Sequence, residues 1–143
     1  MVVNSRESYV GFIERFKEDC KKYKFVRVQW KNGDPRTLPQ NDMFYELYNH
    51  IAEQLYGNDR ELARAEFKLD VGLPILAHDD DDFRDMQLAF EQFPREKQLR
   101  MILAVDITSA MDKDQARRAI DNGLDHYAMA GVIWPEYLLK VKK

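Results

Sequence analysis

The stretch Arg36-Thr37-Leu38-Pro39-Gln40-Asn41, with the apolar run from Met43 to Leu55 behind it, decides how the rest of the chain is organised. Thr37 and Gln40 have the spacing of a capping box, in which a hydroxyl and an amide satisfy backbone N–H groups at the start of a helix. Apolar side chains then recur at helical spacing, at Phe44, Leu47, Tyr48, Ile51 and Leu55. The pattern predicts a helix that starts at this cap and buries one face.

The polar residues at this predicted helix start allow two interpretations. Gln40 and Asn41 follow the guanidinium of Arg36 and lie where a helix exposes free N–H groups and partial positive charge. Such an end attracts phosphate, so the three side chains are candidates for anion or nucleic-acid contacts. The alternative is that they only satisfy backbone groups, because capping boxes are common.

Other segments predict helices on both sides of this one, and two of them predict strands. Helical spacing and capping residues favour helices over residues 5–22, 60–71 and 83–93, and another after Asp112, which forms a second capping box with Gln115. Alternating apolar and polar residues favour strands at Phe25–Trp30 and Leu99–Ile107. The sequence therefore predicts a mixed α+β fold, with a small sheet packed against four to five helices in a single domain over residues 1–143.

Bulk composition fits a globular protein of one domain. The chain has 143 residues, 45% of them hydrophobic, and a formal net charge of −3. The single cysteine, Cys20, allows no intramolecular disulfide and no thiolate zinc site. Because no run approaches the roughly 18 apolar residues of a membrane span, and no signal peptide is recognisable, we expect a soluble, cytoplasmic protein without a membrane partner.

Basic and aromatic residues cluster around the first predicted strand. Arg27 and Lys31 lie on its polar face, Arg36 follows the turn, and Trp30 and Tyr45 are nearby in the sequence. Phosphates require positive charge and unpaired bases require flat apolar surfaces, so this combination is typical of a single-stranded nucleic-acid site. With Arg100 from the second strand, the prediction assigns Arg27, Lys31, Arg36 and Arg100 to phosphates and Tyr45 to a base. The alternative is a core Trp30 beside cations that only solubilise the strand.

Acidic residues 79–82 raise a different possibility. Magnesium-dependent nucleases hold metal ions with carboxylates from separate elements, which here would be Asp70, Asp79–Asp82 and Asp106. Four contiguous aspartates cannot all converge on one ion, so a solvated loop that caps a short helix is the simpler interpretation. We therefore expect no metal and no other cofactor, and we keep a nuclease or junction resolvase as the alternative function. A third possibility is a protein-interaction module that uses the apolar tail at Val132–Trp134.

Three motifs, in order and at matching spacing, resemble the NinB (Orf) family of phage recombination proteins. Residues 36–41 are similar to the family's Arg-Ser-Leu-x-Gln-Asn before its central helix. Residues 107–111 resemble Ser-Thr-Ser-x-Met before the C-terminal helix, and residues 131–135 resemble the family's Gly-Val-x-Trp ending. The resemblance covers residues 24–56 and 99–136, whereas residues 57–98 match poorly.

This resemblance implies an α/β homodimer that binds DNA, prefers single strands and assists a recombinase alongside single-strand-binding protein, without a cofactor or established catalysis. Gln40 and Tyr45 match family positions implicated in DNA contact, and Arg36 and Asn41 match the same motif. Thr108 and Ser109, in the second motif, complete the set of candidate DNA contacts. Where the family has a basic residue before the methionine, this chain has Ala110, so one expected phosphate contact is absent.

Overall fold

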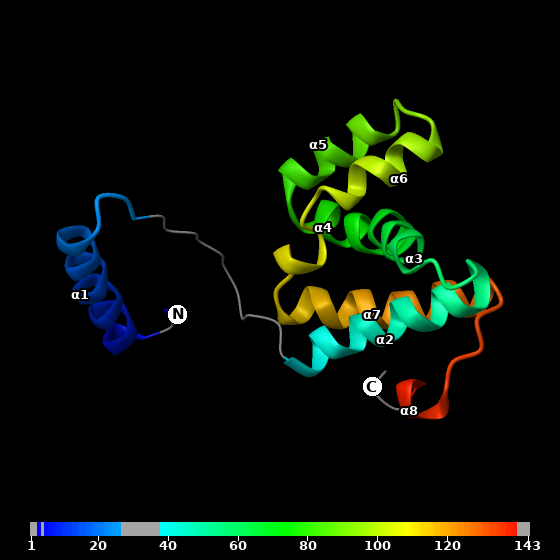
Figure 1. The fold of residues 1–143 in the computed structure, drawn as a ribbon, viewed down its shortest axis with the longest axis horizontal. Helices are drawn as coiled ribbons and strands as arrows, with labels where there is room; N and C mark the ends of the chain where they lie inside the picture. Colours follow the sequence, from blue (N-terminus) through cyan, green and yellow to red (C-terminus); the bar gives the residue numbers. More distant parts are fainter. Residues whose placement is uncertain (1–2, 4, 27–37, 140–143) are drawn as a thin grey trace. The chain divides into compact units, whose positions relative to one another are not determined.

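The computed structural model describes residue 3 and residues 5–26 and 38–139. The chain forms two compact units, residues 1–32 and 33–143, and Figure 1 shows the helices of both. The prediction of one domain over residues 1–143 stays a prediction. No helix in the described ranges is long and apolar enough to cross a membrane.

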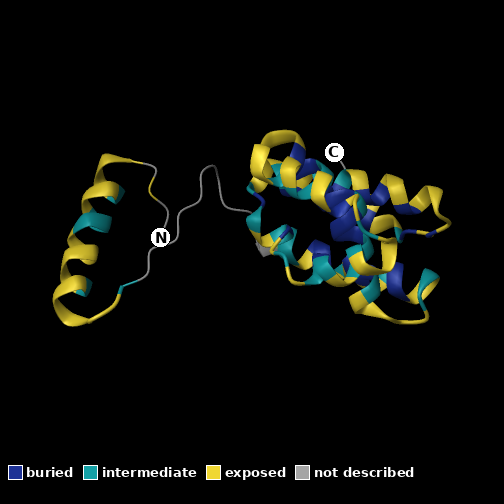
Figure 2. Ribbon diagram, turned by 90° about the horizontal axis from the view of Figure 1, so that it is seen from above, coloured by how far each residue is buried: buried dark blue, intermediate teal, exposed yellow. Residues whose placement is uncertain are grey.

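Among its described residues, the first unit contains one helix, α1, over Arg6–Lys22. Ser5 and Ser8 were both possible caps from the sequence, and Ser5 is the cap: it forms a reciprocal capping box with Ser8 and so satisfies exposed N–H groups of the first turn. The predicted stripe of Tyr9, Phe12, Ile13 and Phe16 lies along this helix, but none of its residues is buried. Figure 2 accordingly colours α1 as intermediate or exposed throughout.

The second unit is helical over residues 38–139, the part of it that the structure describes. Its elements, in chain order, are α2 (Leu38–Leu55), α3 (Arg60–Phe67), the π-helical turn η1 (Lys68–Gly72), α4 (Leu73–Asp79), α5 (Asp81–Phe90), α6 (Arg95–Leu103), the short 3-10 helix η2 (Thr108–Ala110), α7 (Lys113–Met129) and α8 (Glu136–Leu139). The described residues contain no β-strand. The predicted α+β fold with a small sheet is therefore wrong, and the described part of the protein is all-α.

The strand predicted over 99–107 is instead the end of α6 and the turn after it. Pro94 starts this helix, and Arg, Glu, Lys, Gln, Leu and Met, which fill most of it, are good helix formers. Leu99 and Ile102 also share a helical face, with Ile102 fully buried, so the alternation of the apolar residues was misleading. Of the other predicted strand, Phe25 and Val26 are not in a strand, and residues 27–30 lie outside the described residues.

The helix predicted over residues 60–71 continues beyond its predicted end, because Gly72 and Pro74 do not break it. The chain passes from α3 through η1 into α4. Pro74 lies in the first turn of α4, where a missing N–H costs little. Gly72 is required by packing, since a Cβ there would lie 2.6 Å from Ile107 Cγ2.

Capping residues set several other helix boundaries, and one of these caps was predicted. Asp112 and Gln115 form the predicted capping box of α7, and Asp59 caps α3. Gly57, with a φ of 58°, turns the chain after α2. The cap predicted at Thr37 lies outside the described residues.

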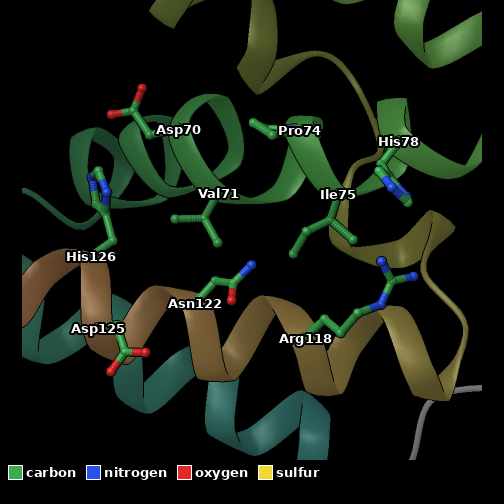
Figure 3. A pocket seen from close by; sticks show the side chains of 9 residues that line it. All are labelled: Asp70, Val71, Pro74, Ile75, His78, Arg118, Asn122, Asp125 and His126. Carbon is green, nitrogen blue, oxygen red and sulfur yellow. The ribbon is translucent and has the colours of Figure 1, made fainter.

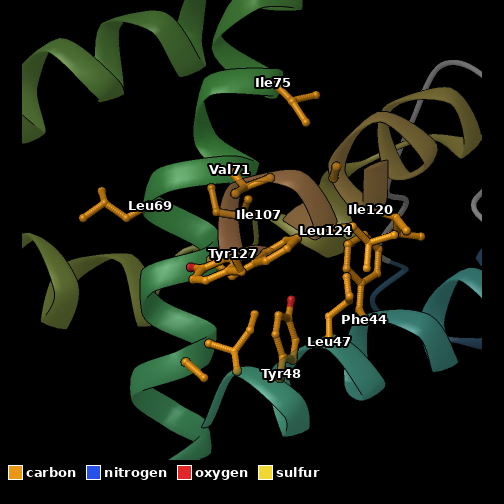
Figure 4. Packing of buried hydrophobic residues seen from close by; sticks show 14 of the residues in the cluster. Phe44, Leu47, Tyr48, Leu69, Val71, Ile75, Ile107, Ile120, Leu124 and Tyr127 are labelled. Carbon is orange, nitrogen blue, oxygen red and sulfur yellow. The ribbon is translucent and has the colours of Figure 1, made fainter. Parts of the chain in front are cut away.

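The core lies between α2, the α3–η1–α4 segment and α7, as Figure 4 shows. Phe67 is fully buried at its centre, where its ring lies edge-on to Phe44 and Tyr48 and stacks on Tyr127. Helix α7 approaches this ring closely at Gly123, where a Cβ would lie 2.5 Å from Phe67 Cε2. Trp134 folds back onto α7 and donates its Nε1–H to Leu124 O at 2.8 Å.

Candidate functional site

A pocket of about 370 Å³ lies between the first turns of α2, the junction of α3 with η1, and the segment around η2. It is lined by Asn41, Phe44, Tyr45, Tyr48, Arg64, Lys68, Asp106, Ile107, Thr108 and Ser109. Four of these, Asn41, Tyr45, Thr108 and Ser109, are candidate contacts from the sequence. The fold thus brings together two segments more than 60 positions apart in the chain.

The rim of this pocket carries an arginine and an aromatic ring. Tyr45 is 61% exposed, because it lies on the opposite side of α2 from the buried Leu47 and Ile51. Arg64 is exposed on α3. Within the described ranges, neither side chain has a hydrogen-bond, ion-pair or ring partner. The guanidinium and the ring are therefore available to a ligand at the pocket entrance.

The floor of the pocket is apolar apart from the Tyr48 hydroxyl and one lysine. Phe44 and Ile107 are buried, and Lys68 is only 4% exposed. Lys68 Nζ donates to Val105 O at 2.8 Å and to Ile102 O at 3.5 Å, so it satisfies carbonyls at the end of α6. Burial, followed by the nearby charge of Arg64, lowers the pKa of Lys68. Its ammonium therefore has a structural role and adds positive charge beside Arg64.

Gln40 and Arg100, the other predicted contacts among the described residues, do not line this pocket. Gln40 donates from Nε2 to Lys113 O at 2.9 Å, which joins α2 to the start of α7. Arg100 is exposed on α6 and does not line the pocket. Arg27, Lys31 and Arg36 lie outside the described residues, so their assignment to phosphates stays a prediction.

Arg64 and Lys68 were not predicted as site residues. They lie four positions apart in the segment predicted to be helical over residues 60–71, so sequence spacing alone places them on one face. The spacing predicts this shared face but not the pocket, because nothing in the sequence shows that the face lies beside Asn41 and Tyr45.

The carboxylates of the alternative metal site are separated and engaged in other contacts. Asp70 accepts two hydrogen bonds from Arg95, each 2.7 Å long, and Arg95 also pairs with Glu66. Asp79 accepts from Gln115 at 2.9 Å and pairs with Arg118. These contacts join α3, η1 and α4 to α6 and α7. Both aspartates therefore have a structural role in holding the helices together.

The rest of the acidic run acts at a helix start, as predicted, but it is not a loop, because Asp79 ends α4 and Asp81 and Asp82 already belong to α5. Asp80 caps α5 by accepting from the backbone N–H groups of Asp82 and Phe83, and Asp81 pairs with Arg84. Among the described residues, no group of three or more histidine, cysteine or acidic side chains is placed to hold a metal ion. The geometry therefore gives no support to a metal-dependent nuclease.

A second groove, of about 460 Å³, lies between the η1–α4 segment and α7. Figure 3 shows Val71, Pro74 and Ile75 on one side of it, facing Arg118 and Asn122 on the other. The charged groups at its ends, Asp70 and Arg118, belong to the ion pairs just described. The groove thus has an apolar floor and few polar groups without a structural role.

The predicted tail interface is divided between core and surface. Val132 and Trp134 are buried, whereas Ile133 is 81% exposed. Two of the three predicted anchors thus form part of the core, and the third remains available for contact with a partner.

Comparisons with known proteins identify no relative of this chain. No protein-family model matches it, and neither a curated protein nor a solved structure matches it significantly.

Proposed function

We propose that the pocket between α2, α3 and η2 binds unpaired DNA. The observation that carries this proposal is the pairing of Arg64 and Tyr45 at the rim of one pocket, without partners among the described residues. A guanidinium binds phosphate oxygens and an exposed ring stacks on a base, which together are the two contacts that a single strand offers. In a duplex the base faces are already stacked, so the Tyr45 contact favours unpaired strands.

The charge around the pocket is favourable, although the whole protein is acidic. Arg64 and Lys68 contribute two positive charges and Asp106 one negative charge. Lys68 is buried and bonded to carbonyl oxygens, so the phosphate contact falls to Arg64. Contact with about one phosphate predicts a weak salt dependence, with affinity falling roughly threefold between about 50 and 200 mM salt. A much steeper dependence would point to a larger basic surface elsewhere in the chain.

A narrower role follows from the sequence resemblance alone. A recombination mediator of the NinB (Orf) type would bind single-stranded DNA as a homodimer and work beside single-strand-binding protein and a recombinase. The resemblance also implied an α/β fold, which the helical structure contradicts. DNA binding by the pocket is therefore the primary proposal, and the mediator role is an extension of it.

The test is fluorescence anisotropy with labelled single-stranded and duplex 20-mers. The proposal predicts tighter binding to the single strand, and about tenfold weaker binding for Tyr45→Ala and for Arg64→Glu. Arg84→Ala is the matched control, because Arg84 is an exposed arginine outside the pocket that pairs with Asp81. Equal binding by all three variants and the wild type would refute the assignment to this pocket.

A further inference from the structure

The pocket behind Tyr45 and Arg64 differs from a groove that only follows a phosphate backbone. Its buried lining includes Phe44, Tyr48 and Ile107. Its exposed charges, Arg64 and Asp106, lie at the rim. Phosphate is strongly hydrated and does not enter an aromatic floor, whereas a nucleobase has apolar faces. The volume of about 370 Å³ is also within the range of small-ligand pockets.

One polar group in the wall fits the edge of a base. Asn41 lines the pocket, and its Oδ1 is buried without a hydrogen-bond partner among the described residues. Buried carbonyl oxygens are nearly always paired in folded proteins, so an unpaired one calls for an explanation. Rotation about the last side-chain torsion is soft for asparagine, so its amide can turn to present Oδ1 to a ligand. Asparagine amides are also established readers of base edges.

We infer that this pocket takes the base of one unpaired nucleotide edge first, with Asn41 Oδ1 accepting an N–H of the base and Arg64 holding a neighbouring phosphate at the rim. The inference rests on the proposed function and adds to it the part of the strand that enters the protein. A strand held in this way must turn one base out of its own stack, so binding depends on the base and on its hydrogen-bonding edge.

Three hexanucleotides separate these contributions: oligo-dT, a fully abasic strand of the same length, and oligo-dT with N3-methylthymidine at every position. The abasic strand keeps the phosphates but removes the bases, and N3-methylation keeps the ring but removes its N–H donor. For the wild-type protein, we expect each modified strand to bind at least tenfold more weakly than oligo-dT.

Asn41→Ala tests the assigned residue, with Asn49→Ala as the matched control. Asn49 is an exposed asparagine on the same helix and does not line the pocket. In Asn41→Ala, oligo-dT should bind about tenfold more weakly, and N3-methylation should then change the affinity less than twofold. The melting temperature of Asn41→Ala should equal or exceed that of the wild type, because the change removes an unpaired buried oxygen and favours the helix.

The outcomes distinguish the inference from the proposal beneath it. If none of the strands binds, the proposed function fails. If oligo-dT and the abasic strand bind equally, DNA binding stands and base insertion is overturned. If N3-methylation has no effect on the wild type, or if Asn41→Ala loses both binding and thermal stability, the role of Asn41 on the base edge is wrong.

Discussion

Substitution of Gly123 by alanine tests the helix packing on which the pocket depends. A Cβ at this position would lie 2.5 Å from Phe67 Cε2 and 3.2 Å from Phe67 Cζ, whereas unstrained carbon contacts are about 3.5–4.0 Å. Relief of the clash requires a movement of roughly 1 Å. The ring has little room to move, because Phe44, Tyr48 and Tyr127 surround it with centroid distances of 5.8, 5.4 and 6.3 Å.

The net cost follows from two opposing effects. Alanine is favoured over glycine inside a helix by about 1 kcal/mol, and overpacking of a rigid core costs about 1–3 kcal/mol. Since the clash involves an enclosed aromatic ring, we take the upper value and expect Gly123→Ala to lose about 2 kcal/mol of unfolding free energy. Urea denaturation should show a lower midpoint with an unchanged slope.

Two further variants make this test specific. Gly11→Ala in α1 introduces the same methyl group with nothing within 4 Å, so it should cause no loss of stability. Phe67→Leu should recover part of the loss when combined with Gly123→Ala, giving a coupling energy of at least about 1 kcal/mol. If Gly123→Ala is as stable as the wild type, the close approach of α7 to Phe67 is refuted.

Three other substitutions probe single contacts. Asp112→Ala removes the acceptor for the Gln115 N–H and should cost about 1 kcal/mol in urea denaturation; no change would contradict the capping box. His78, with Arg118 and Gln115, holds the pKa of Asp79 well below its usual range, so this carboxylate stabilises the fold above about pH 4 and less as the pH falls. Asp79→Asn should therefore lower the melting temperature at pH 7 and make it fall less between pH 7 and pH 3 than in the wild type. An equal fall of the melting temperature in the variant and the wild type would refute this. Trp134→Phe removes the indole N–H that donates to Leu124 O and should cost about 1 kcal/mol by circular dichroism in urea; wild-type stability would show that the tail is not held there.

Helices with clear caps were predictable because the signals are local. Ser5 and Asp112 each combine a capping side chain with a partner three residues later and an apolar stripe behind it. The stripe of α2 was equally predictable, since Phe44, Leu47, Tyr48 and Ile51 are all buried. In such segments, local preference and tertiary packing agree.

The sheet was predicted wrongly because short apolar runs do not distinguish a strand from a helix. In Leu99–Ile107 the apolar residues alternate, yet Leu99, Met101 and Leu103 are only half-buried in a helix that leaves Arg100 exposed. Leucine and methionine favour helices, and this outweighs the alternation. Gly72 and Pro74 were misjudged for a related reason, because packing against Ile107 and a first-turn position make both acceptable within a helical segment.

The pocket itself was only partly predictable. Asn41, Tyr45, Thr108 and Ser109 were selected for their chemistry, but only the fold brings them into one cavity with Arg64 and Lys68. Gln40 illustrates the limit, since its contact with Lys113 O joins two helices that are more than 70 residues apart in the sequence. The spacing of neighbouring residues cannot predict such a long-range contact.

Photo-crosslinking tests most directly whether DNA binds at this pocket. A single-stranded oligonucleotide that contains 5-iodouracil, irradiated in complex with the full chain, reacts with aromatic side chains that stack on its bases. Mass spectrometry of the digested complex should identify Tyr45 as the crosslinked residue, and Arg64→Glu should reduce the yield. Crosslinks confined to other aromatic residues, such as the exposed Tyr137 of α8, would contradict the account.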